Sequence, residues 1–515
     1  MKRSIKSPMN KLVFRRSYHG PFIPAALLVL LIGALVFGCG HDRNNANING
    51  NANGNGNTNV NGNTNVNGNT NGTCVPLDPP QTVGIHVSLE GTPTGAGSVD
   101  DPIDLDTALS ADGPVRAGDT VWIAAGTYSG VFTSDLTGTD ASPITVRAMP
   151  GARVILDSNV GADQGAGLTI NGAWTIYQDL EVLSSDSDRV SEQDTSSPTD
   201  VTLLAGITIF GPHVKVIDCV VHDTAEGFSF WTPSVDSELY GNIIYNNGWT
   251  APGRGHGHAI YTQNETGTKH IEDNIIFFGF GTGIHAYTEG GSIQGFDIAD
   301  NVWFQTGASD PRASQRKDNC LVGGFQPVAR LTLTSNVGWS RGRGTRLGYG
   351  GDVENIDATL VDNYLVESLW IWGHWETLTF TGNTFYGGLD NVAPTDFPGN
   401  DFQTAPPDSG TRVFVHPNRY DPTRARVAIY NYDQAASVDV DLHDILHLGE
   451  AYSVHSVFDL WGAALVEGTY DGAPVAFPMG TVDPPQPNGL PEGIADDDDP
   501  GRLFGAFIVT HSGCK

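Results

Sequence analysis

Short strand-like segments rich in aromatic and imidazole side chains recur between residues 227 and 350. Their sequences are GFSFW (227–231), HAIYTQN (258–264), GIHAY (283–287), NCLVGG (319–324) and TRLGYG (345–350). Side chains alternate between the two faces of a strand, so we expect one apolar residue of each segment to point inward and the next to point outward. The inward residues are then Phe228, Ile260, Ile284 and Leu321. The outward residues are Ser229, Tyr261, His285 and Val322, followed two positions later by Trp231, Gln263, Tyr287 and Gly324.

This outward row points to carbohydrate chemistry. Aromatic rings pack against the apolar faces of sugar rings, and imidazole and phenol groups move protons. An exposed sheet face normally carries small or charged polar residues instead. We therefore predict a groove for a sugar chain on one sheet face. Catalytic candidates are Tyr261, His258, His285 and Tyr287, and substrate-binding candidates are Trp231, Gln263 and Asn264.

The segment RGHGH (254–258) comes directly before the strand that contains Tyr261. Residues two apart on a strand share a face, so His256 and His258 are predicted to flank Tyr261 together. Arg254 lies beside them and is a substrate-binding candidate, as is His256. A plain polar loop is the alternative. A zinc site of His256, His258 and His285 also fits the spacing, although no carboxylate pattern supports it.

Basic residues are rare in this chain and gather after residue 311. The cluster consists of Arg312, Arg316, Lys317, Arg330, Arg341, Arg343 and Arg346. In so acidic a chain, local positive charge could hold an acidic polysaccharide by its carboxylates. Alternatively, these residues pair with neighbouring Asp and Glu side chains.

The combined set could carry out β-elimination on a uronate. This reaction needs neutralisation of the C6 carboxylate, removal of the C5 proton and return of a proton to the departing glycosidic oxygen. Candidates for these three tasks are, in order, Arg346 or Arg316, then Lys317, His258 or His285, and finally Tyr261 or Tyr287. A polysaccharide lyase that cleaves an acidic polysaccharide is therefore the favoured prediction.

Two other functions stay open. A glycoside hydrolase is the second prediction, because Glu265 and Glu289 each follow an aligned outward residue by four positions. Carboxylates about 5–5.5 Å apart suit a retaining mechanism. The third is a surface glycan-binding protein or adhesin, which would use the aromatic face without turnover.

A repeated pattern indicates which elements bring these segments together. The pattern is an apolar residue, a spacer, a small or acidic residue, Asn and further apolar residues. Its asparagines are Asn242, Asn274, Asn301, Asn336, Asn363 and Asn383, and Cys219 occupies the same place one repeat earlier. Short strands with Gly- and Asn-rich turns at such intervals favour a parallel β-solenoid. Stacked coils rise about 4.8 Å each, so the asparagine amides are predicted to form a hydrogen-bonded ladder.

The segments RAGDTVWIAAGTY (116–128), SPITVRA (142–148) and GARVILD (151–157) precede these repeats. They resemble the first coils of the pectate-lyase-like right-handed parallel β-helix superfamily, nearest the chondroitinase B and alginate lyase group. The resemblance covers residues 83–388 and implies the fold more than the chemistry, because the superfamily includes lyases, hydrolases, epimerases and adhesins. It also implies a Lys base and an Arg, commonly beside Ca²⁺, which is the one candidate cofactor. Lys317 and Arg346 are the nearest matches, without the family's motif around them.

The composition of the sequence changes after residue 392. Residues 393–411 are rich in Pro and polar residues and are predicted to be a linker. Alternating segments such as RVFVHPNRY, RVAIYNYD and LFGAFIVT then predict a β-sandwich over 412–515. The predicted fold class is all-β, with a right-handed parallel β-helix (74–392) followed by a small antiparallel β-sandwich accessory domain, in a monomer.

The N-terminal segment is predicted to be a targeting signal. Basic residues precede an apolar run that ends in Gly38-Cys39, which is typical of a bacterial lipoprotein signal peptide over 1–38 with Cys39 as the lipidated residue. The Asn- and Gly-rich stretch within 39–73 cannot build a core and is predicted to be a flexible tether. The predicted location is the cell envelope, as an outer-membrane or surface lipoprotein anchored by its lipid.

The net charge indicates which binding partners to exclude, and the cysteine content indicates which disulfide and metal sites to expect. The formal net charge is −31, which argues against nucleic acid because phosphate contacts need a basic face. In an oxidising compartment we predict a disulfide between Cys74 and Cys514, with Cys219 and Cys320 as buried thiols. No Cys/His spacing suggests a structural zinc site.

Overall fold

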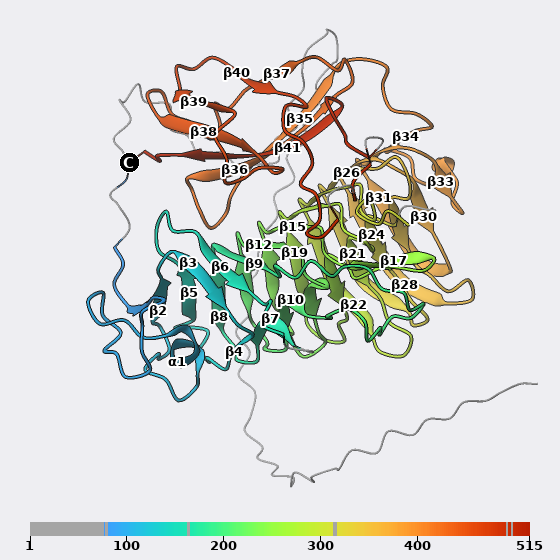
Figure 1. Ribbon diagram of the computed structural model, residues 1–515. Helices are drawn as coiled ribbons and strands as arrows, with labels where there is room; N and C mark the ends of the chain where they lie inside the picture. The colour runs from blue at the N-terminus through green and yellow to red at the C-terminus, as the bar shows by residue number, and fades with distance from the viewer. Residues whose placement is uncertain are drawn as a thin grey trace, which may run out of the picture. The chain divides into compact units, whose positions relative to one another are not determined.

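The computed structural model describes Leu77 and residues 81–161, 165–312, 317–490, 493–495 and 498–514. These residues belong to one compact unit and are almost entirely β-structure (Figure 1). From residue 85 to residue 403 the chain passes repeatedly through three parallel sheets, here called sheets 1, 2 and 3 in the order in which each coil visits them. The strands of successive coils therefore pair side by side.

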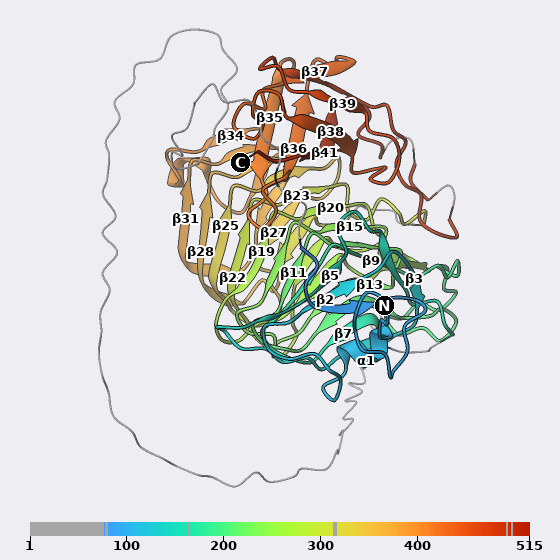
Figure 2. The same cartoon turned by 90° about the vertical axis from the view of Figure 1, so that its left-hand side faces the viewer.

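The strands of sheet 1 are β1 (Ile85–Val87), β2 (Thr120–Ile123), β5 (Ile144–Ala148), β8 (Thr175–Gln178), β11 (Lys215–Ile217), β14 (Glu238–Tyr240), β19 (Lys269–Glu272), β22 (Ile293–Ala299), β25 (Val328–Thr334), β28 (Glu354–Val361) and β31 (His374–Thr381). The strands of sheet 2 are β3 (Gly126–Ser129), β6 (Val154–Asp157), β9 (Leu180–Leu183), β12 (Val220–His222), β15 (Ile243–Tyr245), β20 (Ile275–Phe277), β23 (Val302–Phe304), β26 (Val337–Trp339), β29 (Tyr364–Val366), β32 (Thr384–Tyr386) and β34 (Asp401–Gln403). The strands of sheet 3 are β4 (Phe132–Ser134), β7 (Ala166–Ile170), β10 (Ala205–Ile209), β13 (Glu226–Phe230), β18 (Ile260–Thr262), β21 (Ile284–Ala286), β24 (Cys320–Val322), β27 (Thr345–Leu347), β30 (Leu369–Ile371) and β33 (Leu389–Asp390). Figure 2 shows β31, β28, β25 and β22 running side by side.

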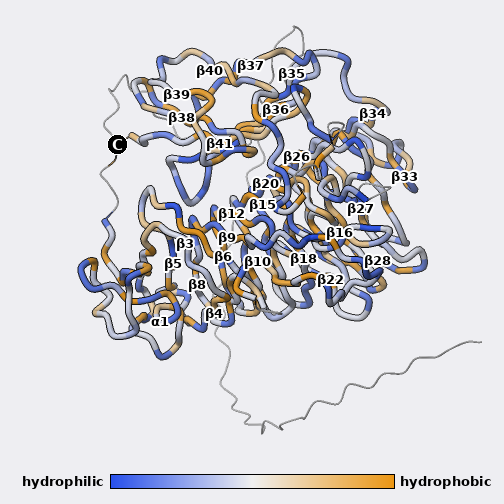
Figure 3. The backbone as a smooth tube through the Cα atoms, in the orientation of Figure 1, coloured by the Kyte–Doolittle hydropathy of each residue, from blue (hydrophilic) through white to orange (hydrophobic). Residues whose placement is uncertain are grey.

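Stacked apolar side chains fill the inside of the solenoid. In sheet 1 one continuous inward column consists of Val121, Val146, Tyr177, Val216, Leu239, Ile271, Ile298, Leu333, Leu360 and Phe380. Burying each such side chain stabilises the fold by about 1.5–3 kcal/mol. Figure 3 shows hydrophobic residues recurring along the stacked strands. The alternation seen in the sequence therefore has its cause in this single elongated core.

The predicted asparagine ladder is present at the bend between sheets 1 and 2. Each side-chain amide donates to the side-chain oxygen of the next asparagine, at 2.9 Å from Asn242 to Asn274 and 3.0 Å from Asn274 to Asn301. The ladder continues through Asn336, Asn363 and Asn383 and ends at Asn400. Each amide also donates to a main-chain carbonyl, so buried polar groups at this bend are paired.

A short helix, α1 (Leu105–Leu109), packs against β1 and β4 at the N-terminal end of the stack. It begins after Asp104, whose carboxylate accepts a hydrogen bond from the main-chain N–H of Thr107 at 2.8 Å. Leu105 and Leu109 are buried beneath it. The helix thus adds apolar contacts to the first coil.

Two antiparallel sheets follow the solenoid. One consists of β35 (Thr411–Pro417), β36 (Arg424–Asn431), β41 (Phe504–His511), β38 (Ala451–Ser456) and β39 (Val466–Thr469). The other pairs β37 (Ser437–Val440) with β40 (Val475–Pro478). Residues of both sheets, among them Val427, Val440 and Phe477, share one buried cluster, so the sheets pack against each other.

The larger antiparallel sheet covers the outer face of sheet 2. Phe304 of β23 packs against Phe504 of β41, with ring centroids 5.1 Å apart. The Tyr430 hydroxyl donates to the carbonyl of Gly338 at 2.6 Å, and Arg426 forms an ion pair with Asp273 at 2.7 Å. Because one contiguous apolar cluster spans both parts, the outer face of sheet 2 is a buried interface.

The predicted fold class is confirmed, with one change near residue 400. Strand β34 and the 3-10 helix η1 (Pro394–Asp396) lie within the segment predicted to be a linker. β34 pairs in parallel with β32, because Asn400 extends the asparagine ladder by one more coil. The limits of the remaining domains stay a prediction.

Several N-terminal predictions lie outside the described residues. These are the signal peptide, Cys39, the tether and Cys74. Cys514 is disulfide-bonded, and its predicted partner is Cys74. Cys219 and Cys320 are buried free thiols, as predicted. Within the described part of the chain, no helix has the length and apolar character needed to cross a membrane.

Candidate functional site

The outer face of sheet 3 carries the residues singled out from the sequence. Strand register places in one line, here called the sheet-3 row, Ser229, Tyr261, His285, Leu321, Arg346 and Trp370. Neighbours in this row lie about 4.8 Å apart across the strands. The solenoid thus brings Tyr261 and His285 together although 24 residues separate them in the chain.

The predicted register was wrong by one residue at β24. Leu321, not Val322, lies in the sheet-3 row, while Cys320 and Val322 belong to the solenoid core. The cause is Asn319, whose buried side chain accepts from the main-chain N–H of Thr306 at 3.0 Å and donates to Glu367 at 2.6 Å. These bonds fix the start of β24, so the small Cys320 faces inward. For the same reason, Gly324 is not level with Tyr287.

Four rings form a continuous contact chain on this face. The ring centroid of Tyr261 lies 5.6 Å from that of Trp231 and 5.5 Å from that of His285. The His285 ring stacks on Tyr287 at 4.9 Å. Coil stacking brings Trp231, Tyr261 and His285 together from three successive coils, whereas His285 and Tyr287 belong to the same coil. The face presents ring surfaces of the kind that pack against sugars.

Lys269 fixes the turn that carries Trp231. Its ammonium group is fully buried inside the solenoid and donates to the carbonyls of Phe230 and Trp231, at 2.7 and 2.6 Å. Burial lowers the pKa of Lys269 well below its ordinary value. The main chain at the end of β13 is thereby held in place.

His258 and His285 form a hydrogen-bonded imidazole pair. Nε2 of His258 lies 3.1 Å from Nδ1 of His285. The main-chain N–H of Thr282 donates to Nδ1 of His258 at 3.2 Å, so this nitrogen carries no proton. In neutral His258 the proton is then on Nε2, which donates to Nδ1 of His285, and the proton of His285 is on its own Nε2. The network therefore sets His285 as a hydrogen-bond donor at Nε2.

Electrostatics keep this pair neutral. Burial lowers the pKa of His258 to about 3. Burial, with smaller effects of His258 and Arg346, also lowers the pKa of His285 well below its ordinary value. Two imidazoles with such low pKa values are weak bases near neutral pH. Their chemistry is to donate hydrogen bonds.

His256 does not join this pair, contrary to prediction. It ends β17 (Arg254–His256), which forms a hairpin with β16 (Trp249–Ala251), and its ring stacks on Trp249 at 5.1 Å. Gly257, with φ of 80°, turns the chain between the two histidines, so they do not share a strand face. Burial lowers the pKa of His256 to about 4.

Lys317 and Arg254 supply positive charge beside the imidazole pair. Lys317 lies in the loop before β24 and is half-buried, whereas Arg254 is exposed. Burial, followed by the charge of Arg254, lowers the pKa of Lys317. Both cations act electrostatically on His258. A lysine with a lowered pKa is more often a free amine, and it remains a stronger base than either imidazole.

Arg346 is held within the fold. It is 5% exposed, and its Nη2 lies 3.3 Å from both carboxylate oxygens of Asp318. Its guanidinium also lies over the rings of Trp370 at 4.8 Å and Trp372 at 5.3 Å. Arg346 therefore organises the aromatic side chains around it.

The other predicted residues take varied places. The amide of Gln263 donates to the hydroxyl of Tyr261 at 3.4 Å. Asn264 is fully buried and donates to the carbonyl of Gln294 at 2.7 Å, so its side chain supports a turn. Arg316 lies outside the described residues. Arg312 pairs with Glu192 at 2.9 Å, as the ion-pair alternative expected.

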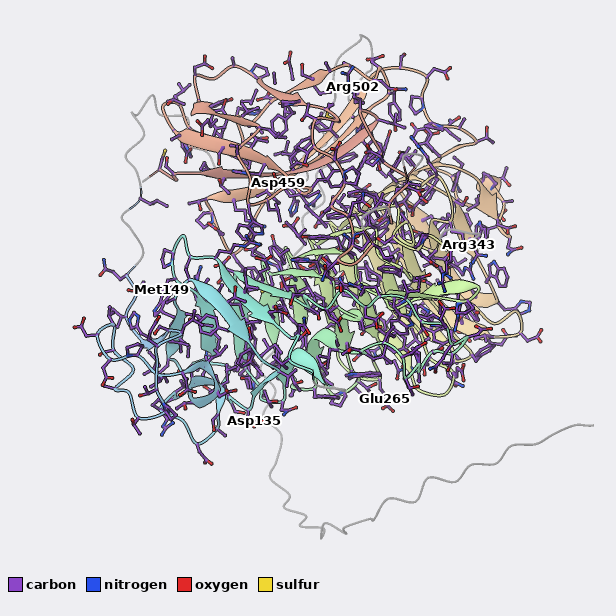
Figure 4. The ribbon with its side chains drawn as sticks, viewed as in Figure 1. Asp135, Met149, Glu265, Arg343, Asp459 and Arg502 are labelled. Atoms are coloured by element: carbon purple, nitrogen blue, oxygen red, sulfur yellow. The ribbon has the colours of Figure 1, made fainter. Side chains whose placement is uncertain are left out.

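The two carboxylates of the hydrolase prediction lie in exposed turns. Glu265 is at the edge of the solenoid (Figure 4), and Glu289 lies in the turn after Tyr287. Both side chains are exposed, whereas a general acid with a raised pKa is usually buried. Their surroundings do not favour the hydrolase prediction.

Several residues of this face were missed from the sequence. Phe325 and Tyr349 pack edge to face at 5.7 Å, and both contact Tyr287. Trp370 continues the sheet-3 row in the next coil. Extending the segment alignment by one repeat to LWIWG (369–373) would have found both tryptophans of that segment. Glu226 was also missed, because nothing in its local sequence distinguishes it from a surface glutamate.

The described side-chain groups that could bind a metal ion do not include the predicted histidines. Among the described residues, two groups of three side chains bring ligand atoms close together: His270, Glu272 and Asp297, and His447, Glu450 and Cys514. Cys514 is disulfide-bonded, so only the first group keeps all three ligands. The predicted zinc trio is not among them, because His256 is stacked on Trp249. Ca²⁺ stays a prediction from the family resemblance.

Comparisons with known proteins give distant likenesses in structure. No protein-family model matches the chain, and no curated protein does. Pectate lyase Pel9A aligns at 16% identity and TM-score 0.37, over 63% of this chain and 81% of its own. An alginate lyase from Paenibacillus sp. str. FPU-7 aligns at 20% identity and TM-score 0.37, over 58% and 94%. A GH136 lacto-N-biosidase from Eubacterium ramulus aligns at 13% identity and TM-score 0.36, over 62% and 67%. At these TM-scores the likenesses carry no inference about activity.

Proposed function

We propose that this protein is a polysaccharide lyase that cleaves an acidic, uronate-containing polysaccharide by β-elimination. One observation carries the proposal: a neutral imidazole pair lies among stacked aromatic rings and beside two cations, on an outer sheet face. Aromatic rings bind sugars, while the cations and hydrogen-bond donors bind carboxylates. The outer face of sheet 2 is not available for a substrate, because the larger antiparallel sheet covers it.

Recognition of the uronate carboxylate is assigned to His285 and Arg254. The Nε2–H of His285 is set as a donor by the chain from Thr282 through His258. Arg254 adds a full positive charge from the neighbouring hairpin. Donors held in place before the substrate arrives stabilise the charge that develops on the carboxylate when C5 loses its proton.

Proton removal is assigned to Lys317. Its amine is the strongest base among the candidates, and its lowered pKa makes the free amine more available. The histidines are less suited, because their nitrogens without a proton are already hydrogen-bond acceptors. Tyr261, whose pKa is raised chiefly by burial, stays protonated and is one candidate to return the proton.

The direct test is an activity screen of the purified full chain on acidic and neutral glycans. The ultraviolet absorbance of an unsaturated uronate is expected with an acidic glycan. Lys317→Met should lower kcat by about 10²–10⁴-fold, the usual contribution of a positioned base. Lys215→Met is the matched control, since Lys215 pairs with Glu238 on sheet 1 at 2.9 Å. Reducing ends without the absorbance would identify a hydrolase, and tight retention without cleavage would identify a binder; either result would refute the lyase.

We also propose that the enzyme is displayed on the cell envelope through lipidated Cys39 and the Asn/Gly-rich tether. The sequence of the signal region supports this, and a surface location would give a polysaccharide enzyme access to its substrate. Cys39→Ala is expected to shift the protein from the membrane fraction to the soluble fraction. Membrane association that survives the substitution would refute the anchor.

A further inference from the structure

Glu226 is a half-buried residue beside the imidazole pair, and the Oε1 atom of its carboxyl group is fully buried. It is the first residue of β13 and pairs with Ala205 of β10. Because Phe228 pairs with Ile260, Glu226 is level with His258. A Cβ on the following Gly227 would meet Asn247 at 3.0 Å and Ile244 of the solenoid core at 3.1 Å, so position 227 faces inward although Phe228 is also a core residue and Ser229 lies in the outer row. The alternation is therefore interrupted at Gly227, and the charge of Glu226 acts on Tyr261 of the outer row.

The surroundings of this carboxyl group contain little that could stabilise its charge. One of its oxygens, Oε1, is buried and has no hydrogen-bond partner in the described part of the chain. The carboxyl group accepts a hydrogen bond from the main-chain N–H of His258. The charge of Glu226 acts on the titratable side chain of Tyr261. His258 is level with Glu226 in the next coil, and the neighbouring strand β10 contributes Ala205. No basic side chain is among the groups that shift its titration.

Burial raises the pKa of Glu226 well above its ordinary value. Burial therefore favours the protonated carboxyl group, which can donate a proton. Burial, followed by the charge of Glu226, also raises the pKa of Tyr261.

We propose that Glu226 is the residue that donates a proton to the departing glycosidic oxygen. This assignment rests on the proposed function and adds a catalytic residue to it. The C5 proton moves to the Lys317 amine, its electron pair forms the C4–C5 double bond, and the C4–O bond breaks. The electrons of that bond stay on the oxygen, which takes the proton of Glu226. The Glu226 carboxylate and the Lys317 ammonium then exchange a proton through solvent, which restores both groups.

The test compares Glu226→Gln with Glu376→Gln, an exposed glutamate of β31 on sheet 1. The amide keeps the shape of the carboxyl group but cannot donate the proton, so kcat on the polymer should fall by about 10²–10⁴-fold. The control should match the wild type. A uronate whose 4-substituent is a nitrophenolate needs no proton on departure, and Glu226→Gln should cleave it as fast as the wild type does.

The pH profile gives a second readout. Activity of the wild type on the polymer should fall as pH rises through the pKa of Glu226, and the residual activity of Glu226→Gln should lack this limb. Equal losses on both substrates would show a merely structural role, and an unchanged rate on the polymer would also overturn the assignment. If the wild type releases reducing ends without unsaturated product, β-elimination is wrong; a glycoside that carries the nitrophenolate at C1 then replaces the 4-substituted uronate and still tests Glu226 as the proton donor.

Discussion

The outer face of sheet 3 has two halves that share one backbone and differ in side chains. In the N-terminal coils the row consists of Thr133, Thr169, Thr208 and Ser229. In the C-terminal coils the same row continues with Tyr261, His285, Leu321, Arg346 and Trp370. The strands pair in parallel with unbroken register across the junction. A coil therefore folds with a small hydroxyl side chain at this position of the row. The need to fold does not explain why the C-terminal coils carry large and ionisable side chains there.

The interior differs between the same two halves. The asparagine ladder begins at Asn242 and runs to Asn400, beneath the coils that carry the aromatic and ionisable side chains. One coil earlier, Cys219 takes the position: its main-chain N–H donates to Asn242 at 3.0 Å, and its thiol makes weak hydrogen bonds to the carbonyls of Ile217 and Tyr177 in place of an amide. A ladder of paired amides fixes coil spacing, which sets how accurately side chains of different coils meet. The ladder thus runs beneath Tyr261, His285 and the later residues of the row, whereas Glu226 and Trp231 lie one coil before its first asparagine.

The largest expected effect comes from breaking the ladder. Asn301→Leu removes the partners of Asn274, of Asn336 and of the carbonyl of Ile271. Several buried polar groups would lose their hydrogen bonds, so the free energy of unfolding should fall by about 3–5 kcal/mol. Cys219→Ala, at the matched position one coil before the ladder, should cost only about 1 kcal/mol. Chemical denaturation measures both; equal losses would show that the ladder adds nothing.

The next effect concerns chemistry on the face. His285→Ala removes the proposed donor to the substrate carboxylate, and kcat should fall by about 10²–10³-fold. Thr208→Ala lies in the same row of the N-terminal half and should change the transition-state energy by less than about 0.5 kcal/mol. Steady-state kinetics on the acidic glycan provide the measurement. A Thr208→Ala loss as large as that of His285→Ala would contradict the division of the face.

Two histidines should make the stability of the fold depend on pH in opposite directions. The pKa of His258 falls from 6.5 to about 3 by burial, so the unfolded chain binds the proton first and stability should fall as pH drops from about 6.5 to about 3. Burial also acts to lower the pKa of His222, but hydrogen bonds to Asp223 and Glu181 raise it to about 9. Its stabilisation is present below pH 6.5 and should be lost as pH rises through about 9.

Thermal melts across pH test this difference. His258→Asn should reduce the acid sensitivity, and His222→Asn should reduce the alkaline sensitivity. Identical pH profiles for the wild type and both variants would show that neither imidazole titrates as its surroundings imply.

The smallest expected effect concerns an exposed ring. Phe325 is 52% exposed beside Tyr287 and Tyr349, so it has little role in the core. Phe325→Ala should raise KM about fivefold without a change in Tm, which corresponds to about 1 kcal/mol. Val131→Ala, an exposed residue of the N-terminal half, should leave KM unchanged. A fall in Tm of Phe325→Ala, with KM intact, would assign the ring to folding.

Part of the site could be read from the sequence. Alternation placed Tyr261 and His285 outward, and the Asn repeat placed them in adjacent coils; both placements agree with the register. The prediction failed where local spacing was not enough. It put Leu321 inside, since the pattern could not show that Asn319 is held by Thr306 and Glu367. It grouped His256 with His258, since a turn at Gly257 is not visible in an alternating segment.

The sequence by itself determined the class of the molecule. A pattern of apolar residues and asparagines that recurs in every coil predicts a parallel β-solenoid, because stacking the coils buries each short strand and pairs each amide. The tertiary structure alone decided the state of each ionisable group. Burial, the imidazole pair and the lack of a partner for Oε1 of Glu226 within the described residues depend on neighbours from other coils, and these neighbours set the pKa values and the direction of each hydrogen bond.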